Sequence, residues 1–342
     1  MRIAVIASPV TPLRPAQAGG AQAMLTDIAT GLARRGHTVR LFCAEGSEVR
    51  GVKLVMVPKP SDASLALVMP GGPPPPPAPG VAAALEAIFE AVIGFGPDVV
   101  SQHAFDAPAF ELANDLPVLH TLHLPPLVPA VTHAVAGIPP KRLATVSESC
   151  RRSWEMAGVD VGWILRNGVP DIDVGNPPTE NVALIAGRLS PEKGVEHAMK
   201  AARSAGLGVR VAGAVYDPTY VVDLDEAEVI GEVSREQLRS VMARSAVTVC
   251  AVRWDEPFGL VAAEAQMAGC PVAAYGRGAM KEVVEDGVGG VLADPDDIVA
   301  LAGAIRECLS LDRHAVRVGA QRRLGLEDAL DRYEAALSEA AI

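Results

Sequence analysis

The chain has 342 residues, enough for two domains that each bury a hydrophobic core. Its composition, 49% hydrophobic and 21% charged, is that of a globular protein and excludes a disordered chain. A formal net charge of −11 argues against nucleic-acid binding, and no apolar run in the sequence is long enough to span a bilayer.

Strands and helices alternate through the first half of the chain. Apolar, β-branched runs predict strands at 3–7, 38–42, 52–57, 98–101, 117–120 and 143–146, the last of which closes this half. Apolar residues at helical spacing, from Met24 to Leu32, predict the first helix. The proline-rich run 71–80 predicts a stiff exposed loop that excludes helix and central strand.

The second half restarts the same pattern near residue 167, where Asn167 and Gly168 predict a tight turn. Strands are expected at 182–186, 209–212, 228–230, 247–251 and 271–275, and helices at 193–205, 234–245, 279–285 and 295–309. Such alternation is typical of parallel sheets with right-handed crossovers. The sequence therefore predicts an α/β protein with two doubly wound halves.

The run from Glu256 to Glu264 lies between two buried strands, in a loop and helix where open α/β sheets bind ligands. Gly259 leaves the backbone uncovered at the helix start, and free N–H groups there form an anion site. Glu256 and Glu264 can accept hydrogen bonds from hydroxyls, and an unpaired Glu264 would be costly in its apolar stretch. An anion site beside hydroxyl acceptors indicates a nucleotide-sugar.

Two cations, Arg188 and Lys193, follow the first strand of the second half. Both could reach a diphosphate, and donors fixed in advance lower the barrier as negative charge grows on that leaving group. Taken alone, they are more readily explained as surface cations on an exposed turn. Asp223 and Asp225 have the spacing of a metal-binding DxD motif, but they lie in an acidic stretch, and we interpret them as unrelated to metal binding.

In the first half, Gly19 and Gly20 open the first helix and would let a diphosphate or an acceptor approach the backbone. His103 and His123 each follow a strand, so they point toward the ligand-binding edge. His120 and His123 could suggest a metal pair, but no third ligand stands nearby in the sequence, and we expect no metal.

The run from Glu256 to Glu264, followed by Gly269-Cys270-Pro271-Val272, resembles the signature of the retaining glycosyltransferases of family 4, which have the GT-B fold. Gly187-Arg188-Leu189 with Lys193-Gly194 resembles a second motif of that family. The resemblance covers nearly the whole chain. It implies two Rossmann-like domains facing each other across a cleft: an acceptor-binding domain over 1–166, a nucleotide-sugar-binding domain over 167–325, and a helix at 326–342 that crosses back to the first.

The resemblance also implies roles for single residues. Glu256 would contact the sugar, Glu264 the ribose, and Arg188 and Lys193 the diphosphate, whereas His123 would touch the donor sugar. The remaining implied contacts are backbone ones, from Gly19, Gly20, Gly187, Ile230, Phe258, Gly259 and Leu260. Gln22 stands where the family commonly has glutamate, so no role is assigned to its side chain.

The function so implied is a retaining, metal-independent transfer of a sugar from a nucleoside diphosphate sugar, with UDP the commonest nucleotide, to an acceptor hydroxyl. No cofactor is expected, and the acceptor would be a small molecule or oligosaccharide, as in natural-product biosynthesis. A nucleotide-sugar epimerase of the same fold and a non-catalytic nucleotide-sugar-binding subunit are the alternatives.

The location of the protein is predicted from charge and from the N-terminus. Residues 1–166 hold 13 Lys+Arg and 13 Asp+Glu, whereas 167–342 hold 17 and 28. The neutral first half predicts no strong membrane association. The first strand reaches Pro9 too early for a signal-peptide core, and the five cysteines show no CxxC spacing. We therefore expect a cytoplasmic protein with reduced thiols.

Overall fold

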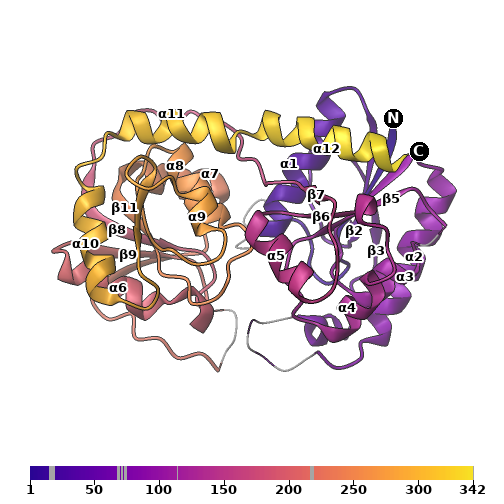
Figure 1. Cartoon of the computed structure of the whole chain (residues 1–342), viewed down its shortest axis with the longest axis horizontal. Coiled ribbons are helices and arrows are strands. Elements are labelled where there is room, and N and C mark those ends of the chain that lie inside the picture. The colour runs from indigo at the N-terminus through magenta and orange to yellow at the C-terminus, as the bar shows by residue number, and fades with distance from the viewer. Residues whose placement is uncertain are drawn as a thin grey trace. The chain divides into compact units, whose positions relative to one another are not determined.

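The structure is a computed structural model that describes residues 1–14, 20–67, 70, 72, 75–113, 115–215 and 219–341. The chain divides into two compact units. Unit 1 contains the N-terminal strand, Ala21–Arg166 and Glu327–Ile342, and unit 2 contains Gly20 and Asn167–Leu326. Each unit is built around one parallel sheet (Figure 1).

Unit 1 has a seven-stranded sheet in the order β3-β2-β1-β4-β5-β6-β7. Its strands are β1 Arg2–Ile6, β2 Thr38–Ala44, β3 Lys53–Val57, β4 Val99–Gln102, β5 Val118–Leu122, β6 Leu143–Thr145 and β7 Trp163–Ile164. Its helices are α1 Gly20–Arg34, α2 Pro79–Phe95, α3 Ala107–Glu111, α4 Pro129–Val135, α5 Glu148–Met156 and α12 Leu326–Ala340, with short 3-10 turns η1 Ala63–Ala66 and η2 Pro140–Arg142.

Unit 2 has a six-stranded sheet in the order β10-β9-β8-β11-β12-β13. Its strands are β8 Glu180–Ala186, β9 Gly208–Ala212, β10 Ala227–Gly231, β11 Ser245–Cys250, β12 Val272–Tyr275 and β13 Gly290–Ala293. Its helices are α6 Val195–Ser204, α7 Arg235–Arg244, α8 Leu260–Met267, α9 Met280–Val283, α10 Ile298–Cys308 and α11 Arg313–Leu324, with the 3-10 turn η3 Pro191–Lys193.

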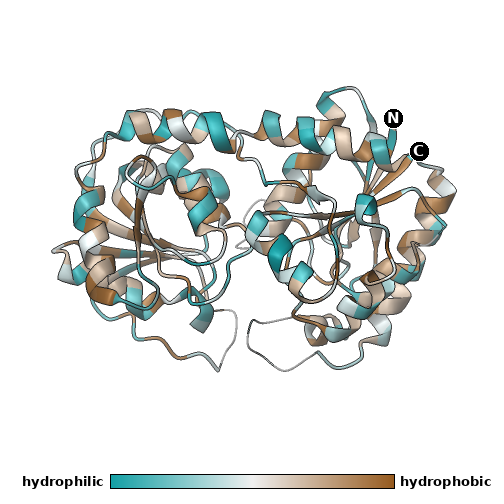
Figure 2. Cartoon of the chain, in the orientation of Figure 1, coloured by the Kyte–Doolittle hydropathy of each residue, from teal (hydrophilic) through white to brown (hydrophobic). Residues whose placement is uncertain are grey.

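In both units the strand order reverses once, between β1 and β4 and between β8 and β11. This is the doubly wound arrangement, and the predicted class, α/β with two Rossmann-like parallel sheets, is confirmed. The central strands are mostly apolar (Figure 2). β11 is buried at every position because helices cover both faces of its sheet.

Four predictions about local structure need correction. Pro79 and Gly80, expected in the loop, begin helix α2, because proline is tolerated in the first turn, where its missing N–H would have no partner. The first sheet continues past 143–146 with β7. The helix expected over 193–205 is divided at Gly194, whose φ of 62° ends η3 before α6 begins. Residues 167–169 form no tight turn, and Val169 instead pairs with Gly325.

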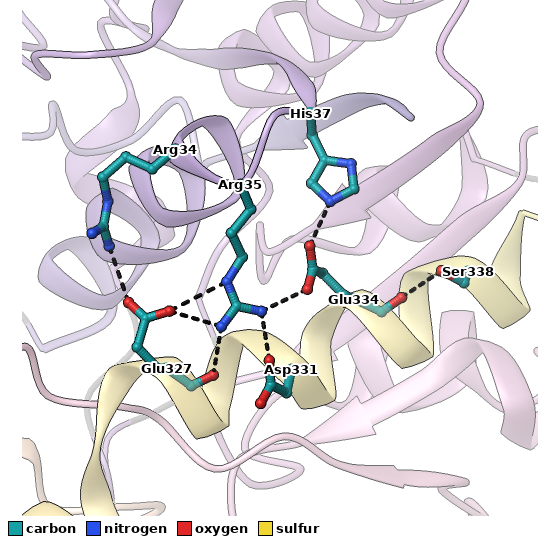
Figure 3. A network of polar contacts seen from close by, with 7 residues as sticks. All are labelled: Arg34, Arg35, His37, Glu327, Asp331, Glu334 and Ser338. Atoms are coloured by element: carbon teal, nitrogen blue, oxygen red, sulfur yellow. Dashed lines mark hydrogen bonds and ion pairs between the residues drawn. The ribbon is translucent and has the colours of Figure 1, made fainter.

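The C-terminal helix α12 packs on α1 within unit 1. Gly31 makes the approach possible, because a Cβ there would lie 2.5 Å from a methyl carbon of Leu330. Arg35 lies beside one face of α12 and binds three carboxylates on it, at spacings of four and three residues (Figure 3). The distances from Arg35 are 2.7 Å to Glu327, 2.7 Å to Asp331 and 2.6 Å to Glu334.

Candidate functional site

The predicted site residues of unit 2 lie in two loops that start side by side. β8 and β11 pair in parallel, with Ala183 opposite Val247 and Leu184 opposite Thr248. The loops that follow these strands therefore leave the sheet at its carboxyl edge, where the strand order reverses. Ligands bind at this point in open α/β sheets.

The two loops meet through Lys193 and Glu256, which are 63 positions apart in the sequence. Lys193 Nζ lies 2.5 Å from Glu256 Oε2, and Trp254 Nε1 donates to the same oxygen at 2.9 Å. The ammonium group also lies 5.6 Å from the centre of the Trp254 ring, within range of a cation–π interaction. Two donors thus hold the Glu256 carboxylate in one orientation.

Arg188 is held in a similar way within its own loop. Its guanidinium lies 2.9 Å from the buried carboxylate of Glu192, which also accepts a hydrogen bond of 2.6 Å from Ser190 Oγ. Burial raises the pKa of Glu192, but the hydrogen bonds from Ser190 and Arg188 outweigh burial, and the pKa lies below its ordinary value. Glu192 is therefore an anion that keeps Arg188 at the carboxyl edge of β8.

The start of α8 matches its prediction from the sequence. Gly259 is the N-cap residue with a φ of 92°, a left-handed conformation that favours glycine, and α8 begins at Leu260. Phe258 before it is buried. The first N–H groups of an α-helix have no acceptor within the helix, so the backbone at this end of α8 can bind an anion.

Glu264 is buried in α8 and paired with two cations of α7. Arg235 binds Glu264 Oε1 directly, and Arg239 Nη2 lies 3.2 Å from the same oxygen. Arg239 is itself only 1% exposed and donates 2.8 Å to the carbonyl of Pro170. An unpaired Glu264 carboxylate would be costly at this buried position, and two arginines of the neighbouring helix α7 are its partners.

The other predicted residues are placed as follows. Gly187 follows β8, and its N–H donates to Ala212 O at 2.9 Å. Ile230 lies near the end of β10 and is partly exposed. Gly20 begins α1, whereas Gly19 lies outside the described residues. His123 directly follows β5 in unit 1, where its Nε2 lies 2.9 Å from Nδ1 of His103.

The structure also describes the acidic pair, the metal-ligand types and the cysteines that the sequence analysis considered. The carboxylate of Asp223 accepts the backbone N–H of Asp225 at 2.9 Å, in a turn before β10. No group of three or more His, Cys, Asp or Glu side chains within the described part of the chain is arranged to hold a metal ion. The five cysteines are buried and free.

Reasoning from sequence missed four side chains that contact predicted ones. Glu192 and Trp254 hold Arg188 and Glu256, and Arg235 and Arg239 hold Glu264. A signal existed for Arg239, because it shares a helical face with the buried residues Met242 and Ala243. A charged residue in an apolar stripe indicates a buried partner.

Comparison with known proteins assigns the family. A model described as glycosyl transferases group 1 matches residues 171–324, and a model described as glycosyltransferase family 4 matches residues 18–169. The structure of HepE from Anabaena in complex with UDP-glucose has a TM-score of 0.74, with 19% identity and coverage of 99% of each chain. The two models, one for each half of the chain, assign it to the family 4 type of glycosyltransferases. The likeness to HepE shows that it has the GT-B fold.

Two named relatives are similar in sequence. The D-inositol 3-phosphate glycosyltransferase of Xylanimonas cellulosilytica is 27% identical over 96% of this chain and 93% of its own length. The protein of the same name from Mycolicibacterium smegmatis is 36% identical over 155 residues, which span 42% of this chain and only 36% of that protein. Among the described residues, no helix is both long and apolar enough to cross a membrane.

Proposed function

We propose that the protein is a retaining, metal-independent glycosyltransferase that moves a sugar from a nucleoside diphosphate sugar, with UDP as the nucleotide, to an acceptor hydroxyl. The contact between Lys193 and Glu256 carries the proposal. In this contact a cation of the loop after β8 lies beside a carboxylate of the loop that leads to the N-terminus of α8, at the switch point of a Rossmann-like sheet. A diphosphate joined to a sugar needs both groups.

In the proposed reaction, Arg188 and Lys193 stabilise the leaving diphosphate. The bond between the anomeric carbon and the diphosphate oxygen breaks, and its electron pair stays on the diphosphate. The acceptor oxygen bonds to the anomeric carbon from the same face, and its proton passes to the leaving oxygen. Two fixed cations lower the barrier because they meet the charge as it develops.

The remaining proposed contacts are with different parts of the ligand: the sugar, the ribose and the phosphates. Glu256 accepts hydrogen bonds from sugar hydroxyls, and Glu264 accepts them from the ribose. Backbone groups of Phe258, Gly259 and Leu260 bind the phosphates and sugar, while the backbone at Gly187 and Ile230 contributes to binding the nucleotide.

In unit 1, His123 is proposed to bind a hydroxyl of the donor sugar, and Gly19 and Gly20 to admit the diphosphate or the acceptor. The acceptor itself is proposed to be a small molecule or an oligosaccharide. Support for UDP as the nucleotide comes from HepE of Anabaena, which has the same fold and was crystallised with UDP-glucose.

The deciding experiment is calorimetric titration with UDP, GDP and ADP, first with a chelator and then with added Mg²⁺. We expect UDP to bind without metal and binding to weaken in Lys193→Ala, with Lys200→Ala on the exposed side of α6 as the control. Binding of none of the nucleotides would overturn the proposal.

Product analysis then tests the reaction class. With donor and a panel of acceptors, we expect a glycoside whose anomeric configuration matches that of the donor. An epimerised nucleotide-sugar formed from donor alone would favour the epimerase. Loss of turnover on chelation would contradict the metal-independent mechanism.

A further inference from the structure

Three polar side chains form a continuous hydrogen-bonded row at the carboxyl edge of the unit 1 sheet. Ser101 lies in β4, His103 follows the end of that strand, and His123 follows the neighbouring strand β5. Ser101 Oγ lies 2.8 Å from His103 Nε2, and His103 Nδ1 lies 2.9 Å from His123 Nε2. The two imidazole rings are stacked, with centroids 5.2 Å apart and an interplanar angle of 19°.

Desolvation favours the neutral form of both imidazoles. Ser101 is fully buried and His103 is 5% exposed, against the ring of Tyr333. Burial lowers the pKa of His103 well below 6.5, and burial likewise lowers the pKa of His123 to about 4. A neutral imidazole carries a single N–H, so each ring donates from one nitrogen and accepts at the other.

The number of hydrogens then determines which atom donates and which accepts in each hydrogen bond of the row. Within the described residues, the Ser101 hydroxyl has no hydrogen-bond partner other than His103 Nε2. A buried hydroxyl hydrogen without an acceptor is costly, so Ser101 donates to His103 Nε2. His103 must then carry its hydrogen on Nδ1 and donate it to His123 Nε2. The hydrogen of His123 is left on Nδ1, which contacts no hydrogen-bonding group in the described part of the chain.

We propose that His103, oriented by Ser101, is a positioning residue that holds His123 in the tautomer with its hydrogen on Nδ1, so that His123 donates a hydrogen bond to an oxygen of the sugar substrate. The inference rests on the proposed function for the identity of that oxygen. The tautomer itself is a property of unit 1 alone. An imidazole free in water favours the hydrogen on Nε2, so the row selects the less common form.

The test is a long-range ¹H–¹⁵N NMR spectrum of the full chain labelled with ¹⁵N-histidine, recorded at pH 7 without substrate. His123→Gln identifies the signals of His123 among the seven histidines. We expect the wild type to show the hydrogen of His123 on Nδ1. His103→Phe keeps a stacked ring but removes the donor, and the signal should move toward the Nε2 tautomer. His103→Gln can still donate to His123 and should restore the Nδ1 form.

His133→Gln, at an exposed position of α4, is the control and should leave the His123 signals unchanged. Circular dichroism checks that each variant is folded. A wild-type spectrum with the hydrogen on Nε2 would overturn the proposal, as would an unchanged tautomer in folded His103→Phe.

Turnover separates this inference from the proposed function. In a chain that transfers sugar, His103→Phe should lower kcat/KM roughly tenfold, the effect of losing one hydrogen bond, and His103→Gln should recover most of it. If the Nδ1 tautomer is present but no sugar is transferred, the proposed function fails while the positioning of His123 by His103 stands.

Discussion

At the scale of single residues, the cations expected to bind a diphosphate are already paired. Lys193 binds Glu256, and Arg188 binds Glu192. Each cation is thereby kept at the carboxyl edge of the sheet rather than extended into solvent. A bound diphosphate adds charge of the same sign as these carboxylates, so the cations would be shared between ligand and protein. Such an arrangement preorganises the donors at little cost when the ligand enters.

Removal of either cation should slow the reaction. We expect Arg188→Ala and Lys193→Ala each to lower kcat by roughly 10²–10³, because each removes a donor to the developing charge on the leaving group. Steady-state rates with donor and acceptor measure the effect, with Lys200→Ala as the matched control. Near wild-type rates in both variants would rule out the leaving-group role.

Glu264 should discriminate the ribose hydroxyls. We expect Glu264→Gln to weaken UDP binding by about tenfold or more, because a charged hydrogen-bond acceptor is lost. Calorimetry measures the binding of UDP and of 2′,3′-dideoxy-UDP to the wild type and to the variant, as a double-mutant cycle. The variant should weaken the binding of UDP but not that of 2′,3′-dideoxy-UDP, which lacks the ribose hydroxyls. An equal loss for both ligands would show that Glu264 acts on stability, through Arg235 and Arg239, rather than on the ribose.

At the scale of elements, α12 is held beside the end of α1 by Arg34, Arg35 and His37, and Arg35 makes the most contacts. The three carboxylates that Arg35 binds repeat along a single face of α12, while the adjacent face buries Leu330, Tyr333 and Leu337 (Figure 3). The apolar face provides most of the stability because it removes surface from water. The charged face sets the axial position of the helix.

Arg35→Ala should therefore loosen α12 without unfolding unit 1. We expect a loss of about 1 kcal/mol, because two of the three carboxylates are well exposed and water screens them. Urea unfolding followed by tryptophan fluorescence measures the loss, and Arg50→Ala, an exposed residue of unit 1, is the control. A loss no larger than in that control would contradict the role of the cluster.

At the scale of the whole molecule, stability should depend on pH through three histidines of unit 1, of which His103 and His120 are buried and His123 is partly exposed. Burial lowers the pKa of His120 to about 3, that of His123 to about 4 and that of His103 well below 6.5. Above pH 6.5 these histidines are neutral in both the folded and the unfolded chain. Below that pH the unfolded chain binds protons that the folded chain does not, so the free energy of unfolding falls as the pH falls toward 4. Asp106 has the opposite effect. Burial raises its pKa to about 6, so the folded chain binds a proton below that pH and the free energy of unfolding rises.

With three histidines against one aspartate, unit 1 should lose a few kcal/mol between pH 7 and pH 5. Urea unfolding in a Trp254→Phe background isolates unit 1, since the remaining tryptophans, Trp154 and Trp163, both belong to it. His103→Phe should reduce the slope and His133→Gln should not. Stability that is flat or rises on acidification would contradict the burial of neutral histidines.

Much of the fold followed from local patterns. Apolar runs located β1, β8 and β11, and the apolar spacing from Met24 to Leu32 located α1. The predicted ends of two helices were wrong. Pro79 was expected in a loop but is tolerated in the first turn of α2, and Gly194 interrupts the helix that was expected over 193–205. Helix α11 was not predicted.

By itself, the sequence determined the α/β class, the positions of most strands along the chain and the residues that stand in the loops after β8 and β11, because periodicity and motif spacing are properties of neighbouring residues. Only the tertiary structure decided which groups are partners: Lys193 with Glu256 at a separation of 63, Arg239 with Glu264 at 25, and Arg35 with α12 at nearly 300. The burial of a charge, its partner and the tautomer of an imidazole depend on distances between segments far apart in the chain, and no local pattern contains those distances.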